Sequence, residues 1–241
     1  MTKQHPGVRL AGLRGGQVKA AYTRLREAIV RGSLAPGTRI METDVARWLD
    51  LSRSSVRTVL HRLQHEGFVE AHGDGPRSRL TVAPLTRDDF WELSEVVGEV
   101  EGLAAARVAR RPSPDRRTIA TNLRGINRRL AKAVRATPRD QLAVFRLDDE
   151  FHRTLVEAAA SRRLNSLHHA VKPQLQRYEG VYFSMAERGE DSVKEHEAAI
   201  QAVEAGEPDR AHEAIRRNLV NAAAHLSQRI EALGERGAFG N

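Results

Sequence analysis

Over the last two thirds of this 241-residue chain, apolar side chains recur at three- and four-residue steps, and no strand-like segment interrupts them. The first segment after Pro84 carries apolar residues at Trp91, Leu93, Val96, Val100, Leu103 and Val108, a pattern that favours a helix. Proline and glycine separate the segments, as expected at helix ends. The pattern predicts an all-helical bundle, with helices at residues 87–110, 115–136, 140–160, 164–183, 192–205 and 209–233.

The first 85 residues have a different pattern. Helical spacing predicts helices at residues 18–31 and 43–49, the second capped by Thr43, and Ser52 is placed to cap a third at 53–66. Short strands are expected at 68–71 and 79–82, around a glycine-rich tip. We therefore expect a mainly α protein: a disordered arm (1–16), a winged helix-turn-helix (17–84), the helical bundle (85–234) and a disordered tail (235–241).

Charge is concentrated in the same N-terminal third. The chain has 39 Lys or Arg against 31 Asp or Glu, a net charge of +8. Residues 1–85 hold 14 of the basic and 7 of the acidic residues, which is typical of a nucleic-acid-binding module joined to a neutral domain. No segment has the length of apolar sequence that a membrane span or a secretory signal needs. Cysteine is absent. We therefore expect a cytoplasmic protein without disulfides or thiolate metal sites.

The third helix of the N-terminal module has the chemistry of a recognition helix. Arg53 and Arg57 lie four residues apart, so they share a face at the end that would enter the major groove. A guanidinium can bind guanine through two hydrogen bonds, and hydroxyl groups can bind phosphates. An ordinary solvated face is the alternative. The predicted DNA-contacting residues are Ser52, Arg53, Ser54, Ser55 and Arg57 on the helix, with His72, Arg77 and Arg79 at the wing.

A separate group of residues in the helical region could bind a metal ion. Asp148 and His152 are four residues apart on one predicted helix, and His196 lies near the start of another. A carboxylate and an imidazole at that spacing can bind one divalent cation. An isolated histidine is more often a core or surface residue, so spacing alone leaves both interpretations open.

The N-terminal module resembles the GntR family of bacterial regulators. The segments Leu25–Ile29, Gly32–Ile40, Leu51–Arg57 and Glu66–Val69 are similar to the family pattern in register. The resemblance implies a transcription factor that binds a palindromic operator as a homodimer. It also implies that Arg53 and Arg57 contact operator bases or phosphates, and that the wing tip reaches the minor groove.

The helical region resembles the FCD effector domain of the FadR subfamily. The resemblance rests on Asp148 and His152 with the residues after them, and on Glu195-His196 followed by Ile200 and Ala205-Gly206. It implies that Asp148, His152 and His196 ligate a divalent metal, with zinc, nickel and manganese not distinguished. The family's further histidine ligand is replaced here by Asn218, which can ligate only through its amide oxygen.

The resemblance also implies a small-molecule effector, with an organic acid as one candidate. The family often carries an arginine on the first helix of this domain to pair with an effector carboxylate, and Val97 occupies that position here. Either Arg128 or Arg177 takes over this task, or the effector is not a simple organic acid held there.

Together these features predict a ligand-responsive transcriptional regulator, with repression the expected direction. A metal-dependent enzyme with an appended DNA-binding module is the alternative. It is disfavoured because the sequence has no His-Glu-x-x-His motif, phosphate-binding loop or nucleophile elbow. An architectural DNA-binding protein without a ligand is the third interpretation.

Overall fold

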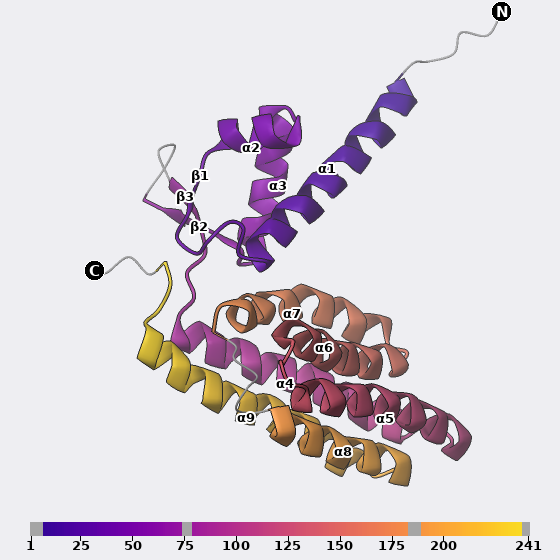
Figure 1. Cartoon of the computed structure of the whole chain (residues 1–241). Coiled ribbons are helices and arrows are strands. Elements are labelled where there is room, and N and C mark those ends of the chain that lie inside the picture. The colour runs from indigo at the N-terminus through magenta and orange to yellow at the C-terminus, as the bar shows by residue number, and fades with distance from the viewer. Residues whose placement is uncertain (1–6, 74–78, 183–188, 238–241) are drawn as a thin grey trace, which may run out of the picture. The chain divides into compact units, whose positions relative to one another are not determined.

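The structure, a computed structural model, describes residues 7–73, 79–182 and 189–237. The chain divides into two compact units (Figure 1). The first comprises residues 1–86 together with 235–241, and the second comprises residues 87–234.

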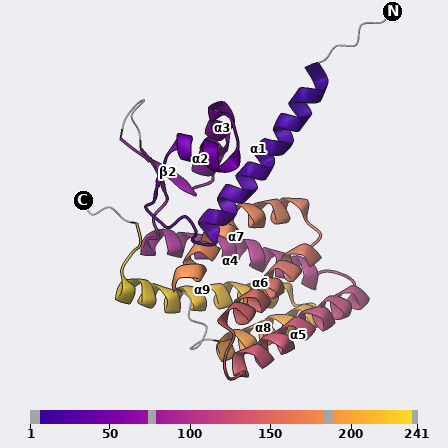
Figure 2. The same cartoon turned by 45° about the horizontal axis from the view of Figure 1, so that its top comes forward.

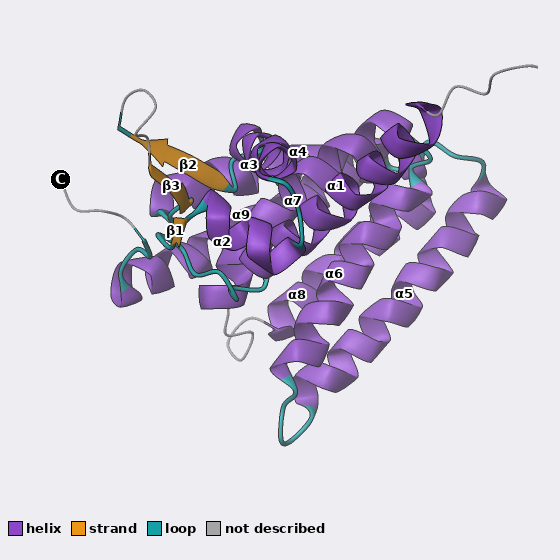
Figure 3. Ribbon diagram, turned by 90° about the horizontal axis from the view of Figure 1, so that it is seen from above, coloured by secondary structure: helices purple, strands orange, loops and turns teal. Residues whose placement is uncertain are grey.

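Within its described residues, the first unit has three helices, α1 (Gly7–Val30), α2 (Glu42–Leu49) and α3 (Arg53–His65). Its strands β1 (Arg39–Ile40), β2 (Val69–His72) and β3 (Arg79–Val82) form an antiparallel sheet in the order β1-β3-β2, drawn in orange in Figure 3. The predicted fold class, a winged helix-turn-helix followed by a helical bundle, is confirmed. Strand β1 was not predicted, because two residues are too short to show an alternating pattern.

The core of the first unit holds α3 by its apolar face. Val56, Leu60 and Leu63 of α3 are buried together with Leu25 of α1 and Phe68 at the entry to β2. Full burial of one such side chain stabilises the fold by about 1.5–3 kcal/mol. With one face of α3 fixed in this way, the opposite face keeps Arg53 and Arg57 exposed.

Three local predictions for this unit were wrong. Residues 7–16 belong to α1 rather than to a disordered arm; the segment contains no proline, and glycine weakens a helix without breaking it. Met41 and not Thr43 occupies the N-cap position of α2, without a side-chain capping hydrogen bond, and Glu42 and Asp44 in the first turn complement the helix dipole. The C-terminal segment is also ordered at Arg236, because its backbone exchanges two hydrogen bonds with Leu85.

The second unit is the predicted helical bundle. Its described residues form α4 (Arg87–Ala109), α5 (Ser113–Arg135), α6 (Gln141–Ala158), α7 (Arg162–Tyr182), α8 (Gly189–Ala205) and α9 (Pro208–Leu233). Helix α4 packs along α9 (Figures 1 and 2) and also contacts α6, α7 and α8. Gly102 permits the close approach to α9, because a Cβ atom there would lie 3.0 Å from the His212 ring. No helix in the described part of the chain combines the length and apolar character needed to cross a membrane.

Candidate functional site

The N-terminal end of α3 presents a group of hydroxyl and guanidinium side chains. The Ser52 hydroxyl caps the helix by accepting a hydrogen bond from the backbone N–H of Ser55 at 3.3 Å. It lies 3.0 Å from the hydroxyl oxygens of both Ser54 and Ser55. Arg53 and Arg57 are exposed. The end of α3 therefore brings together the predicted base-reading arginines and phosphate-binding serines.

Arg57 is held in place by a neighbour on α2. Its Nε donates to the two carboxylate oxygens of Glu42, at 2.9 and 3.0 Å. The two terminal nitrogens of the guanidinium are not used in this contact. Arg57 and Glu42 line a groove of about 540 Å³ together with Arg39 of β1 and Arg79 of β3. Arg39 on β1 and Glu42 on α2 were not predicted as site residues, because their proximity to α3 depends on long-range packing.

The wing contributes one predicted residue in a well-defined position. His72 lies at the end of β2, with its Nε2 atom 2.9 Å from the hydroxyl of Thr81 on β3. Arg79, at the start of β3, is exposed. Arg77, also predicted to contact DNA, lies outside the described residues.

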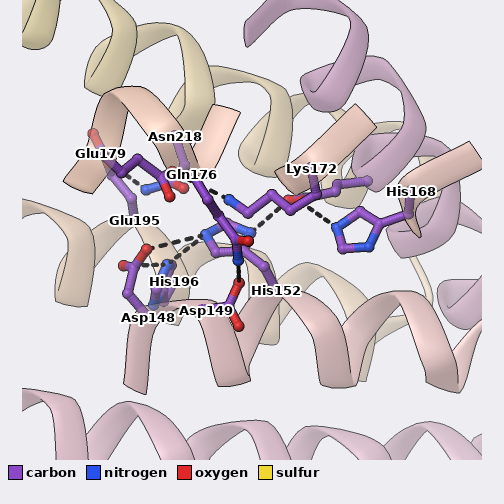
Figure 4. A network of polar contacts seen from close by, with 11 residues as sticks. Asp148, Asp149, His152, His168, Lys172, Gln176, Glu179, Glu195, His196 and Asn218 are labelled. Carbon is purple, nitrogen blue, oxygen red and sulfur yellow. Dashed lines mark hydrogen bonds and ion pairs between the residues drawn. The ribbon is translucent and has the colours of Figure 1, made fainter. Parts of the chain in front are cut away.

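In the second unit, Asp148 and His152 of α6 and His196 of α8 lie together (Figure 4), with one ligand atom from each within 4.8 Å of the others. His152 and His196 are buried, at 2% and 0% exposure. Their Nε2 atoms are 3.3 Å apart. The oxygens of Asp148 lie 3.8 Å from the His152 Nε2 and 3.7 Å from the His196 Nε2. Phe151 stacks on the His196 ring with centroids 3.8 Å apart, which fixes the orientation of that ring.

This geometry fits a bound cation. Two nitrogen ligands that are each about 2.1 Å from one ion lie about 3.0–3.4 Å apart in octahedral or tetrahedral sites. The 3.3 Å between the histidine nitrogens falls in that range, and the Asp148 oxygens are slightly farther away. A set of two imidazoles and a carboxylate suits zinc, nickel or manganese.

Glu101 of α4 contacts the ring nitrogen of His152 that faces away from Asp148 and His196. It is 0% exposed, and one of its oxygens lies 2.6 Å from the Nδ1 atom of His152. Its other oxygen lies 2.9 Å from the Nε2 of His168 on α7. Metal-ligating histidines commonly direct their second ring nitrogen to a carboxylate in this way. Glu101 was not predicted as a site residue, although its place on the apolar stripe of Val97, Ala104 and Val108 distinguishes it from a surface glutamate.

The electrostatics of the group favour positive charge. Burial alone would raise the pKa of Glu101, but His152, His168 and Lys172 hold that pKa well below its ordinary value. Burial also opposes the charged form of His152, yet Glu101 and Asp148 raise its pKa above the ordinary value. The pKa of Asp148 is raised, mainly by burial. Glu101 therefore places a negative charge beside His152, whereas burial opposes the ionisation of Asp148.

A wider polar network on α7 adjoins this group (Figure 4). Lys172 is buried and donates to Glu179 at 3.3 Å. Gln176 donates to Asp149 at 2.8 Å. The first contact lies within α7, and the second connects α7 to α6.

Asn218 of α9 is buried and bonded to a neighbour of the predicted ligands. Its Nδ2 donates to Glu195 at 2.8 Å, and Asn221 donates to the other oxygen of Glu195 at 2.7 Å. The amide oxygen of Asn218 is the atom able to ligate a cation.

The two arginines predicted to bind an effector differ in burial. Arg128 is exposed on α5 and lines a surface pocket with Lys132 and Arg135. Arg177 is 3% exposed and belongs to α7, the helix that carries His168 and Lys172. Val97, at the family's arginine position, is fully buried.

Each of the two units matches the model of a known protein family. Residues 17–76 match the model for bacterial regulatory proteins of the gntR family, and residues 92–221 match the FCD domain. The chain belongs to the GntR family and carries an FCD domain. Family and fold are those of transcriptional regulators, the class that the sequence favoured over a metal-dependent enzyme.

Known relatives of this GntR regulator are also regulators of the helix-turn-helix type. One, from the TAR-I ttuE-ttuC' intergenic region of Agrobacterium vitis, is 34% identical over 146 residues, 60% of this chain and 82% of the relative. YdhC of Bacillus subtilis is 24% identical over 212 residues, 87% of this chain and 91% of YdhC. Neither has an established function.

Solved structures show the same fold. E. coli McbR/YncC has a TM-score of 0.63 at 19% identity, covering 88% of this chain and 97% of that one. A putative GntR regulator from Rhodococcus sp. RHA1 has a TM-score of 0.63 at 23% identity, with the same coverage.

Proposed function

We propose that this GntR regulator is a ligand-responsive repressor that binds a palindromic operator as a homodimer in the cytoplasm. A small metabolite, held at a metal ion in the FCD domain, would change its operator affinity. The sensing half of this proposal is supported mainly by the buried His152 and His196 and the half-buried Asp148, whose ligand atoms lie within 4.8 Å of one another.

The DNA-binding half of the proposal rests on α3. Its capped N-terminus directs unpaired backbone N–H groups and a positive dipole end outward, where a phosphate can bind. Arg53 and Arg57 extend from the exposed face of the same turn and are the proposed readers of operator bases. His72, Arg77 and Arg79 are the proposed wing contacts, and Ser52, Ser54 and Ser55 the proposed phosphate contacts.

The metal is proposed to be held by Asp148, His152 and His196, with Asn218 or water as a further ligand. A divalent cation there supplies a Lewis-acid centre that attracts oxygen atoms of a carboxylate or hydroxyl group. Glu101 keeps the His152 ring oriented toward this centre. Arg177 is the better candidate than Arg128 for pairing with an effector anion, because it is buried on a helix of the polar network.

An effector can change operator binding only by its differential affinity for two arrangements of the protein. The metal ligands come from α6 and α8, and their supporting residues come from α4 and α7. A ligand that bridges these helices would therefore favour one packing of the FCD domain over another, and so one spacing of the two DNA-binding units.

The test is an operator titration with tag-free protein, loaded with zinc, nickel or manganese, in the presence and absence of small organic acids. We expect at least one acid to change the operator affinity of the metal-loaded protein. The response should disappear in His152→Ala and persist in His169→Ala, a change at an exposed histidine of α7. Protein that takes up none of the three metals would refute the sensing half and leave the DNA-binding half intact.

A further inference from the structure

Helix α4 keeps one stripe of its surface uncovered, although it packs against four other helices of the bundle. Val96 and Leu103, seven residues apart on this stripe, are 49% and 45% exposed. A separation of seven residues is two helical turns, so both side chains point the same way. The opposite face of α4 is deeply buried, as Val97 and Ala104 show. The two apolar side chains form a narrow stripe, which is the geometry by which one helix packs against another.

The charged residues of this ridge are divided by sign. The exposed acidic residues of α4 all precede Val100, and they are Asp88, Asp89, Glu92, Glu95 and Glu99. Two of them have partners within the chain: Asp89 accepts a hydrogen bond from the Tyr178 hydroxyl at 2.5 Å, and Glu99 lies 3.2 Å from the Nε2 of His212. The exposed basic residues of the ridge are Arg107 and, just beyond the helix end, Arg110. The exception is Arg87 at the first position, which is paired with Glu231 of α9 at 2.6 Å. The N-terminal half of the ridge is therefore acidic and the C-terminal end is basic.

We infer that α4 packs antiparallel against α4 of a second copy of this chain, around a two-fold axis that passes between Glu99 and Val100. Residues at equal sequence distance from that point then lie opposite each other. Val96 meets Leu103 of the second copy, and Glu92 meets Arg107 of the second copy. Each pair occurs twice, as a two-fold interface requires.

The pattern selects a second copy rather than an unrelated partner. One register aligns the two apolar residues with each other, and the same register aligns the acidic Glu92 with the basic Arg107. A parallel arrangement would place like charges side by side, which is unfavourable. This inference rests on the proposed homodimer and specifies the surface that forms it.

The absence of cysteine from the chain permits a direct test by disulfide formation. Val96→Cys and Leu103→Cys chains, co-expressed with different tags, should form a disulfide-linked heterodimer on mild oxidation. Each variant alone should form little, because identical positions would be about 10 Å apart along the helix, beyond disulfide reach. Co-expression of Val96→Cys with Leu142→Cys, an exposed leucine of α6, is the matched control.

Charge reversal provides a second test that does not depend on oxidation. Glu92→Arg and Arg107→Glu should each weaken the dimer about tenfold or more, because like charges then face each other twice. The double variant should recover most of the loss, as measured by analytical ultracentrifugation at matched thermal stability. A stable dimer that shows neither the cross-link nor the recovery would refute the proposed α4 interface but not the homodimer. A chain that stays monomeric at operator-binding concentrations would overturn both.

Discussion

The two units use charged side chains in opposite ways. On the DNA-binding unit, Arg53 and Arg57 are exposed, and Arg57 touches a single carboxylate. In the FCD unit, Glu101, His152 and Lys172 are almost completely buried and depend on one another. Exposed ion pairs contribute about 0–1 kcal/mol to folding, whereas loss of one partner from a buried pair is strongly destabilising.

This difference indicates how each site can respond to its ligand. Exposed arginines can be selected for operator recognition with little effect on the fold. The buried network ties the packing of four helices to the charge at its centre, so a bound ligand there changes the stability of the domain. Substitutions in the two regions should therefore give opposite results: a folding defect in one and a binding defect in the other.

The largest effect is expected for Glu101→Gln. It removes the negative charge that faces His152 and His168, and removal of one partner of a buried pair costs about 3–5 kcal/mol. The free energy of unfolding of the FCD unit, measured by urea titration of metal-free protein, should fall by that amount. Glu157→Gln, at an exposed position of α6, is the control and should change it by less than about 0.5 kcal/mol. Equal effects of the two substitutions would show that Glu101 does not hold the network together.

Metal binding should increase the free energy of unfolding of the FCD unit by slightly less than Glu101→Gln is expected to reduce it. A ligand present at about 100 times its dissociation constant adds about 2.7 kcal/mol to the stability of the native state. His152→Ala removes a proposed ligand, so its metal affinity should fall by more than the roughly 10–100-fold typical of supporting residues. Calorimetric titration and thermal melting with zinc measure both effects, with His169→Ala as control. A melting temperature of His152→Ala that rises with zinc as in the wild type would exclude this ligand set.

On the DNA-binding unit, Arg53→Ala and Arg57→Ala should leave folding unchanged and impair recognition. Each should lose about 1–3 kcal/mol of discrimination between the operator and a sequence altered at the contacted base. Their unfolding free energies should stay within about 0.5 kcal/mol of the wild type. Arg31→Ala, at an exposed arginine of the loop after α1, provides the comparison. If both variants retained full operator affinity, α3 would not be the recognition helix.

The same contrast explains how far the sequence could be interpreted alone. The long helices of the FCD unit were predicted within a few residues, because each has a regular apolar pattern, whereas the start of α1 was predicted eleven residues too late. The pairing of Asp148 with His152 followed from their four-residue spacing. Strand β1 and the bridge between Leu85 and Arg236 could not be predicted, because they depend on long-range backbone pairing.

The supporting residues were harder to find than the ligands. Glu99 and Glu101 lie two positions apart on α4, yet Glu99 is exposed and Glu101 is buried. Composition and charge do not separate them, and the position of Glu101 on the apolar stripe does. Glu42 gave no comparable signal, because its partner Arg57 is 15 residues away on another helix.

Of these substitutions, Glu42→Gln should have the smallest effect. It also gives the clearest separation of a binding defect from a folding defect. The Glu42 carboxylate binds the Nε of Arg57 and leaves the terminal nitrogens of that guanidinium for bases. Because the pair is exposed, Glu42→Gln should change folding by less than about 1 kcal/mol. It should nevertheless reduce discrimination between operator and random DNA, because Arg57 loses its orientation while one negative charge leaves the groove. Titrations on both DNAs should show non-specific binding strengthened and specific binding unchanged or weakened. If instead both affinities rose equally, Glu42 would act only through its charge and not by positioning Arg57.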